Sequence, residues 1–183
     1  MKILKHRVNS YDKIDDNFGA EIDIRDQNGE LVVSHDLPIS SSIRLEEFLK
    51  KINKQQLIAI NIKSVEIETN LKKIISKTDL ENYFTFDWPI PSLIKAQNNQ
   101  IICAFRLSEY EKEIFPNCSW VWIDSFKEIW YGQKELEDLK DKGFNIALVS
   151  PELHGREIDF GRFESIVDTG IADAICTNNP EYW

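Results

Sequence analysis

Short apolar runs recur along the whole chain and alternate with segments of helical spacing, and this alternation restricts the possible folds more than any other feature. Eight of these runs are expected to be strands: 3–7, 20–25, 57–62, 83–87, 101–106, 119–124, 145–150 and 174–177. A strand followed by a helix, repeated many times, is typical of a parallel sheet covered by helices. Residues 31–34 form a further extended piece, expected to pair across a turn at 26–29.

The segments between these runs carry the spacing of helices that bury one side. Residues 45–53 have apolar side chains at 45, 48, 49 and 52, which is one buried stripe, and 67–77 repeat the pattern. The serine run at 40–42 is expected to cap the first of these helices. Pro91 suits the first turn of a helix at 91–98, and shorter helices are expected at 135–142 and 162–167.

Eight strands alternating with helices predict a compact TIM-type (β/α)8 barrel of class α/β, formed by one domain over residues 1–183. Such barrels typically use about 250 residues, so some helices must be shortened or missing. The connection at 8–19 is already too short for a full helix. An open doubly wound sheet is the alternative. Polar residues at the strand ends favour the barrel, because its active face lies there; they include Arg7, Arg25, Lys63, Asp87, Arg106, Asp124, Ser150 and Thr177.

Charge and composition exclude some classes of partner. The net charge of −9 argues against a nucleic-acid backbone or an anionic membrane as the main partner, since both would repel the chain. The first residues contain no long apolar segment, and no run approaches the roughly 20 apolar residues of a membrane span. Cys103, Cys118 and Cys176 lack close metal-type spacing and are expected to be reduced. We expect a cytoplasmic protein, with an oligomer possible.

Two histidine dipeptides flank a strand that carries spaced acids. His6 and Arg7 end the first apolar run, Glu21 and Asp23 lie in the second, and His35 closes the hairpin segment. Cleavage of a phosphodiester needs a base for the attacking oxygen and an acid for the leaving oxygen, and histidine titrates in the range that suits both. His6 and His35 are therefore the predicted catalytic pair, with the two roles left open.

Glu21 and Asp23 are two residues apart on a strand and so share a face. An inward-pointing carboxylate pair is costly unless a positive charge neutralises it. A divalent cation, Mg²⁺ or Ca²⁺, would do so through oxygen ligands. A salt bridge to Arg7, Arg25 or Lys63 is the alternative.

Four side chains are candidates for binding the substrate. Arg7 and Lys63 are possible phosphate clamps, since arginine offers a planar fork of donors and lysine a point charge. Arg106 would add a third cation, or else form a structural ion pair like the other two. Glu152, in the polar loop after the seventh strand, could bind a substrate hydroxyl.

The ordered motifs resemble the N-terminal signature of the glycerophosphodiester phosphodiesterases, within the superfamily of phosphatidylinositol-specific phospholipases C. The resemblance rests on His-Arg at 6–7, Gly-Ala-Glu-Ile-Asp-Ile at 19–24 and Asn-Gly-Glu-Leu-Val-Val-Ser-His-Asp at 28–36. Weaker matches follow in the same order at 60–63 and 172–180. The resemblance implies a barrel hydrolase that uses a divalent metal, in which a neighbouring substrate hydroxyl attacks first and a cyclic phosphate forms.

The chain departs from that family at identifiable positions. Val8 replaces a glycine, Asn61 replaces a metal-binding glutamate and Asn178 replaces a final aspartate, while the insert after His35 is almost gone. Asn61 becomes the expected third metal ligand, a neutral one. The sequence thus predicts a short divergent member acting on a small soluble phosphodiester. The alternatives are a non-catalytic barrel that binds a phosphorylated metabolite and an enzyme that transforms a sugar phosphate on the same fold.

Overall fold

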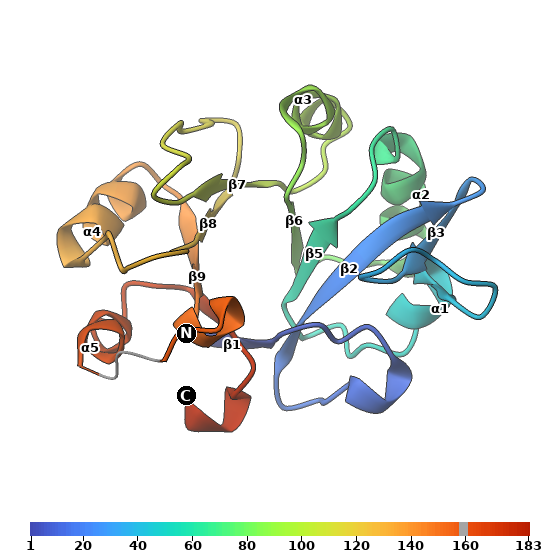
Figure 1. Cartoon of the computed structure of the whole chain (residues 1–183). Coiled ribbons are helices and arrows are strands. Elements are labelled where there is room, and N and C mark those ends of the chain that lie inside the picture. Colours follow the sequence, from blue (N-terminus) through green and yellow to red (C-terminus); the bar gives the residue numbers. More distant parts are fainter. Residues whose placement is uncertain (158–160) are drawn as a thin grey trace.

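The computed structural model describes residues 1–157 and 161–183, and within them eight parallel strands form a ring (Figure 1). The strands are β1 (Lys2–Lys5), β2 (Gly19–Gln27), β5 (Ile58–Ile62), β6 (Tyr83–Phe86), β7 (Ala104–Leu107), β8 (Trp120–Ile123), β9 (Asn145–Val149) and β10 (Ala174–Thr177). Neighbours in that order are paired, β6 and β7 through an isolated bridge, and β10 pairs with β1. The predicted barrel is confirmed, and the open sheet is excluded.

The link between β6 and β7 is the weakest in the ring of strands. In the described chain these two strands are joined by a single parallel bridge between Thr85 and Cys103. The Thr85 N–H donates to the carbonyl of Ile102 at 2.9 Å, and the Thr85 hydroxyl does the same at 2.9 Å. The barrel is therefore closed at this point by one residue on each side.

A hairpin extends one side of the barrel. The C-terminal half of β2 pairs antiparallel with β3 (Glu30–Val33), which pairs with β4 (Ile43–Arg44). Asn28 and Gly29 turn the chain with φ of 56° and 87°, a conformation that asparagine and glycine adopt most readily. The predicted hairpin is confirmed, and it returns the chain to the middle of β2, where Ser34 N–H donates to the carbonyl of Asp23 at 2.9 Å.

The helices are short and unevenly distributed around the ring. They are α1 (Leu45–Leu49), α2 (Glu68–Thr78), α3 (Ile90–Asn98), α4 (Gln133–Asp141) and α5 (Arg162–Asp168), with 3-10 turns η1 (Tyr11–Lys13), η2 (Pro151–His154) and η3 (Pro180–Tyr182). A single 3-10 turn, η1, links β1 to β2, and the described loop from β7 to β8 contains no helix. The expectation of shortened helices is confirmed. Across the described ranges, every helix is too short or too polar to cross a membrane.

The expected serine cap was wrong. Helix α1 follows Arg44 directly, because Ile43 and Arg44 pair with β3 as β4 and place the serine run before that strand. The helix also ends at Leu49, four residues earlier than its apolar spacing suggested. Pairing with a neighbouring strand has here overridden the local capping signal.

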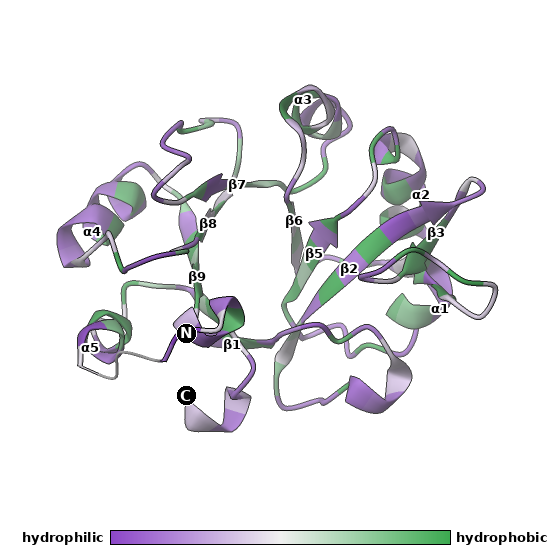
Figure 2. Ribbon diagram, viewed as in Figure 1, coloured by the Kyte–Doolittle hydropathy of each residue, from purple (hydrophilic) through white to green (hydrophobic). Residues whose placement is uncertain are grey.

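Two apolar layers hold the barrel together. Inside, aromatic rings of β6 and β8 stack in pairs, Phe84 on Trp120 with centroids 4.4 Å apart and Phe86 on Trp122 at 4.0 Å. The same inner cluster contains small residues, including Ala59, Ala147, Ala174 and Cys176. A second layer fills the space between strands and helices; Figure 2 shows apolar residues along the strands and polar residues over much of α4. The packed interior leaves the strand ends as the place for a polar site.

Candidate functional site

Polar side chains gather at the C-terminal ends of the barrel strands. Alternation along each strand points every second side chain inward, so the inward positions at these ends fall at the barrel mouth. Besides inward strand positions, the polar residues gathered here include Asp87, just after β6, and two residues of η2. This group, called the mouth ring below, consists of His6, Glu21, Asp23, Asn61, Lys63, Asp87, Arg106, Asp124, Glu152, His154 and Asn178. The ring brings together most of the residues that the sequence singled out.

One half of the mouth ring centres on the two acids of β2. The Nδ1 atom of His6 lies 2.9 Å from Oδ1 of Asn178, and its Nε2 lies 3.9 Å from Oε2 of Glu21. Lys63 places its Nζ 3.5 Å from Oδ1 of Asp23. The ends of β10, β1, β2 and β5 are thus connected through their side chains.

The other half is built of alternating charges. Lys63 Nζ lies 3.9 Å from Oδ2 of Asp87, which also pairs with Arg106, whose Nε donates to Oδ1 at 3.2 Å. Arg106 Nη1 donates to Oδ2 of Asp124 at 2.8 Å, and the second oxygen of Asp124 contacts Nε2 of His154. Arg106 was predicted to bind phosphate; its guanidinium is held between two carboxylates.

Glu21 and Asp23 are nearly inaccessible to solvent, with exposed fractions of 2% and 1%. Glu21 accepts a hydrogen bond from the backbone N–H of Arg7 at 2.8 Å. Burial, and then the neighbouring charge of Asp23, raise the pKa of Glu21 to about 8. The surrounding protein therefore does not supply enough positive charge for both carboxylates, and a proton or a cation is needed at neutral pH.

The residues around this pair fit a divalent cation. Asn61 lies opposite Asp23 in the register of β2 and β5, and its buried Oδ1 has no hydrogen-bond partner among the described residues. Two carboxylates and an amide oxygen are ligands that Mg²⁺ and Ca²⁺ accept. In the described ranges, no three His, Cys, Asp or Glu side chains are grouped to hold a metal, so such a site depends on the Asn61 amide. The alternative of a salt bridge is realised in part, by Lys63.

The hydrogen bond of His6 to Asn178 defines the tautomer of its ring. An amide oxygen only accepts, so the contact with Asn178 requires a proton on Nδ1 and leaves the Nε2 lone pair towards Glu21. Burial is the main cause that lowers the pKa of His6, which favours the neutral ring. The next residue, Arg7, has a φ of 53°, an unusual conformation for a side-chain-bearing residue, and its side chain is exposed.

His35 lies after the hairpin and outside the contacts of the mouth ring. Its side chain is 37% exposed, and Nδ1 lies 3.1 Å from Oδ1 of Asp36. Arg25 anchors this segment by donating from Nε to the backbone carbonyl of His35 at 3.0 Å, so it makes no salt bridge to the acids.

Glu152 lies after the seventh barrel strand, as expected, and its carboxylate is held by neighbouring strand ends. Its Oε1 accepts from the Asn178 N–H at 3.0 Å and from the Thr177 hydroxyl, and its Oε2 accepts from the hydroxyl of Ser150. The carboxylate thus ties the end of β9 to the end of β10. In this position Glu152 orients Asn178, the partner of His6.

Two parts of the site were not assigned by sequence reasoning. Asn9 brackets Asp23, donating from Nδ2 to Oδ2 at 2.8 Å and accepting from the Asp23 N–H at 2.9 Å. In the sequence, only its position two residues after the His-Arg dipeptide indicated that Asn9 could belong to the site. The contact between Asp124 and His154 joins residues 30 positions apart, and only the end position of Asp124 on its strand pointed towards it.

Comparison with known proteins gives matches among solved structures. No family model and no curated protein matches the chain. A glycerophosphodiester phosphodiesterase from Thermotoga maritima is 17% identical with a TM-score of 0.72, covering 100% of this chain and 96% of that one. A phosphodiesterase from Oleispira antarctica, in complex with the product sn-glycerol-3-phosphate, is 13% identical with a TM-score of 0.68 over 100% and 94%.

A third solved structure extends the same group. It is a glycerophosphoryl diester phosphodiesterase from Parabacteroides distasonis, 13% identical with a TM-score of 0.56, covering 98% of this chain and 83% of that one. These likenesses span the whole chain and show that it has the TIM-barrel fold of the glycerophosphodiester phosphodiesterases. The resemblance drawn from the motifs is confirmed at the level of the fold.

Proposed function

We propose that this chain is a short, divergent glycerophosphodiester phosphodiesterase that hydrolyses a small phosphodiester at the barrel mouth. Two observations support the proposal: the ordered motifs of the sequence, and the fold that the chain shares with three phosphodiesterase structures. The observation that carries it is the buried pair of Glu21 and Asp23 beside the Nε2 atom of His6. Such a pair is costly for stability and is therefore best explained by a site that binds a cation.

In the proposed reaction His6 is the general base. The hydrogen bond from Nδ1–H to Asn178 leaves Nε2 free to take the proton of an attacking hydroxyl, from water or from a neighbouring group of the substrate. That oxygen bonds to phosphorus as the bond to the leaving alcohol breaks. His35, on the hairpin side, would give its proton to the leaving oxygen.

The remaining residues of the mouth handle charge. Glu21, Asp23 and the Asn61 amide would hold a divalent cation, which when bound stabilises negative charge on a non-bridging phosphate oxygen. The exposed side chain of Arg7 would contact the phosphate. Lys63, which lies between Asp23 and Asp87, would add a second positive charge near the phosphate. A neutral amide binds cations less strongly than a carboxylate, so we expect weak metal affinity.

The test is turnover of a glycerophosphodiester and of an activated diester such as bis(p-nitrophenyl) phosphate, with added Mg²⁺ or Ca²⁺ and with chelator. We expect His6→Asn and His35→Asn each to lower kcat by about 100-fold or more, with unchanged circular dichroism. Asp79→Asn, an exposed change far from the mouth at the end of α2, is the control. Retention of full turnover by both histidine variants would refute the assigned roles.

A second candidate is a barrel that binds a phosphorylated metabolite without cleaving it. It is favoured by one observation: Lys63 already lies 3.5 Å from Asp23, so part of the neutralising charge comes from the protein. Calorimetry with sugar phosphates and glycerol phosphates, with and without Mg²⁺, separates the two functions. Binding without turnover over a broad panel of diesters would support the second candidate.

A further inference from the structure

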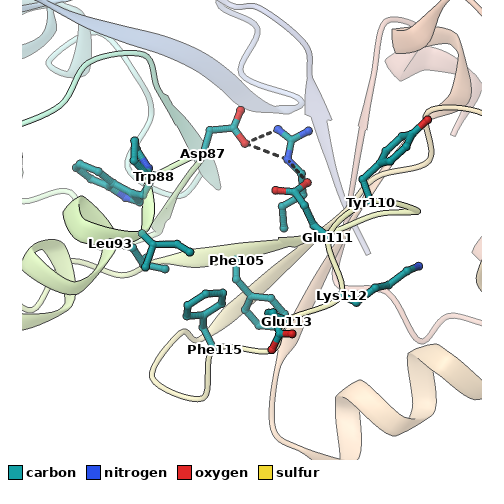
Figure 3. A pocket seen from close by; sticks show the side chains of 12 residues that line it. Asp87, Trp88, Leu93, Phe105, Tyr110, Glu111, Lys112, Glu113 and Phe115 are labelled. Carbon is teal, nitrogen blue, oxygen red and sulfur yellow. Dashed lines mark hydrogen bonds and ion pairs between the residues drawn. The ribbon is translucent and has the colours of Figure 1, made fainter.

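A cavity of about 730 Å³ opens beside the barrel mouth, outside the ring of strands. Its apolar wall comes from Trp88, Leu93, Phe105 and Phe115, and its lining also includes Asp87 and Arg106 of the mouth ring. Figure 3 shows Asp87 with its dashed contacts on one side of the cavity and Leu93, Phe105 and Phe115 on the other. The cavity is therefore apolar along its depth and charged at the end near the mouth.

The cavity exists because a helix is missing. The described loop from β7 to β8 contains no helix, so the outward face of β7, where Phe105 lies, is covered by single side chains such as Phe144 and Phe115 and not by a helix. Phe115 in that loop covers part of the face, with its ring centroid 6.3 Å from that of Phe105. The neighbouring connection, which includes Trp88 and α3, forms the other wall.

The charged end of the cavity belongs to the site already described. Asp87 has a φ of 64°, an unusual conformation for a non-glycine residue, and this turns the chain at the end of β6 where its carboxylate meets Arg106. Lys63 lies 3.9 Å from Asp87 and 3.5 Å from Asp23. One lysine side chain therefore separates the buried acid pair from the entrance of the cavity.

We infer that this cavity binds an apolar chain or ring carried by the alcohol part of the substrate. The inference rests on the proposed phosphodiesterase function and narrows it: the substrate would be an amphiphilic phosphodiester, with its phosphate at the acid pair and its apolar part beyond Asp87 and Arg106. The volume falls within the range of about 300–1,000 Å³ that small-molecule sites occupy. A diester with two small polar alcohols would leave the apolar wall unused.

The contact with the mouth argues for a substrate group over a second copy of the chain. A protein surface would cover the exposed rim residues Ile90 and Tyr110 but would gain nothing from the border that the cavity shares with the mouth ring at Asp87 and Arg106. The rim also carries alternating charges at Glu111, Lys112 and Glu113, which limits the continuous apolar surface available to a partner. The occupant that uses both the apolar depth and the charged entrance is one molecule with both characters.

The test is a series of glycerophosphodiesters whose second alcohol is methanol, butanol or hexanol, assayed below any aggregation concentration. Burial of each methylene should raise kcat/KM by up to about fourfold, so we expect the hexyl ester to exceed the methyl ester by about tenfold or more. Turnover of the methyl ester tests the proposed phosphodiesterase function, and the dependence of kcat/KM on chain length tests whether the cavity binds the apolar group. The two can therefore fail separately.

Helix α3 offers a matched pair of variants. Ile90 and Ile94 are both exposed, at 57% and 52%, and only Ile90 lines the cavity. We expect Ile90→Asp to lower the hexyl-to-methyl ratio of kcat/KM at least about threefold, since it places a charge beside the apolar wall. Ile94→Asp should keep the ratio of the unchanged protein.

Three outcomes would overturn the inference. The first is a methyl ester that is cleaved as well as the hexyl ester by the unchanged protein. The second is a chain-length preference that Ile90→Asp and Ile94→Asp alter equally. The third is a dimer, measured by ultracentrifugation, that Ile90→Asp dissociates while the chain-length ratio is unaffected. If no ester is cleaved at all, the proposed function fails and this inference falls with it.

Discussion

The buried acid pair makes stability depend on pH in a direction that can be measured. In the folded chain the pKa of Glu21 lies at about 8, against an ordinary value of 4.5, a difference of about 3.5. A group whose pKa is raised by folding contributes its full stability below the unfolded value, and this contribution is lost as the pH rises through the folded value. Without a bound cation, stability should therefore fall between about pH 4.5 and pH 8.

The size of the effect follows from the same difference. One pKa unit corresponds to about 1.4 kcal/mol, which gives an upper limit of about 5 kcal/mol at pH 8 and above. Domains of this kind are stable by about 5–15 kcal/mol in total, so the loss should be large. Glu21→Gln removes the charge but keeps an oxygen that accepts from the Arg7 N–H. We expect this variant to be more stable than the unchanged protein by about 3–5 kcal/mol near pH 8 in chelator.

The assay is denaturant unfolding between pH 5 and pH 9 in chelator, with Glu81→Gln as an exposed control. The unchanged protein and the control should lose stability with rising pH, whereas Glu21→Gln should show a flatter profile. Saturating Mg²⁺ should restore the free energy of unfolding of the unchanged protein, because ligand binding to the folded state adds stability. The free energy of unfolding of Glu21→Gln should change little on adding Mg²⁺. Parallel pH profiles for all three proteins would refute the reasoning.

Three further predictions concern the site and its support. Asn61→Glu should tighten Mg²⁺ binding by about tenfold or more in calorimetry, because a third carboxylate faces the cation, and unchanged affinity would exclude this residue as a ligand. Asp124→Asn should destabilise the fold by about 3–5 kcal/mol in urea unfolding, since it leaves the half-buried Arg106 with one strong partner fewer; a loss below about 1 kcal/mol would show that the pair is not structural. Phe84→Ala should cost about 3–5 kcal/mol by removing the ring stacked on Trp120, whereas Tyr182→Ala, at an exposed ring, should cost much less.

The order and type of the main elements could be read from the sequence because they depend on local patterns. Apolar runs of strand length and the stripe at 45, 48, 49 and 52 report which side of each element is buried. The turn at Asn28 and Gly29 follows from backbone preferences of two adjacent residues. Strand ends carry polar residues, so the approximate membership of the mouth ring could also be predicted.

Only the tertiary structure decided which of those residues meet. Closing the ring of strands brings Asn178 to His6 and His154 to Asp124, and these contacts join residues 172 and 30 positions apart. It also turned Glu152 towards β10 and made the serine run precede a strand. The pKa of Glu21 and the cavity beside Asp87 depend on burial and on a missing helix, which are properties of the assembled barrel. Local periodicity determines the elements, while distances between distant side chains depend on how the barrel closes.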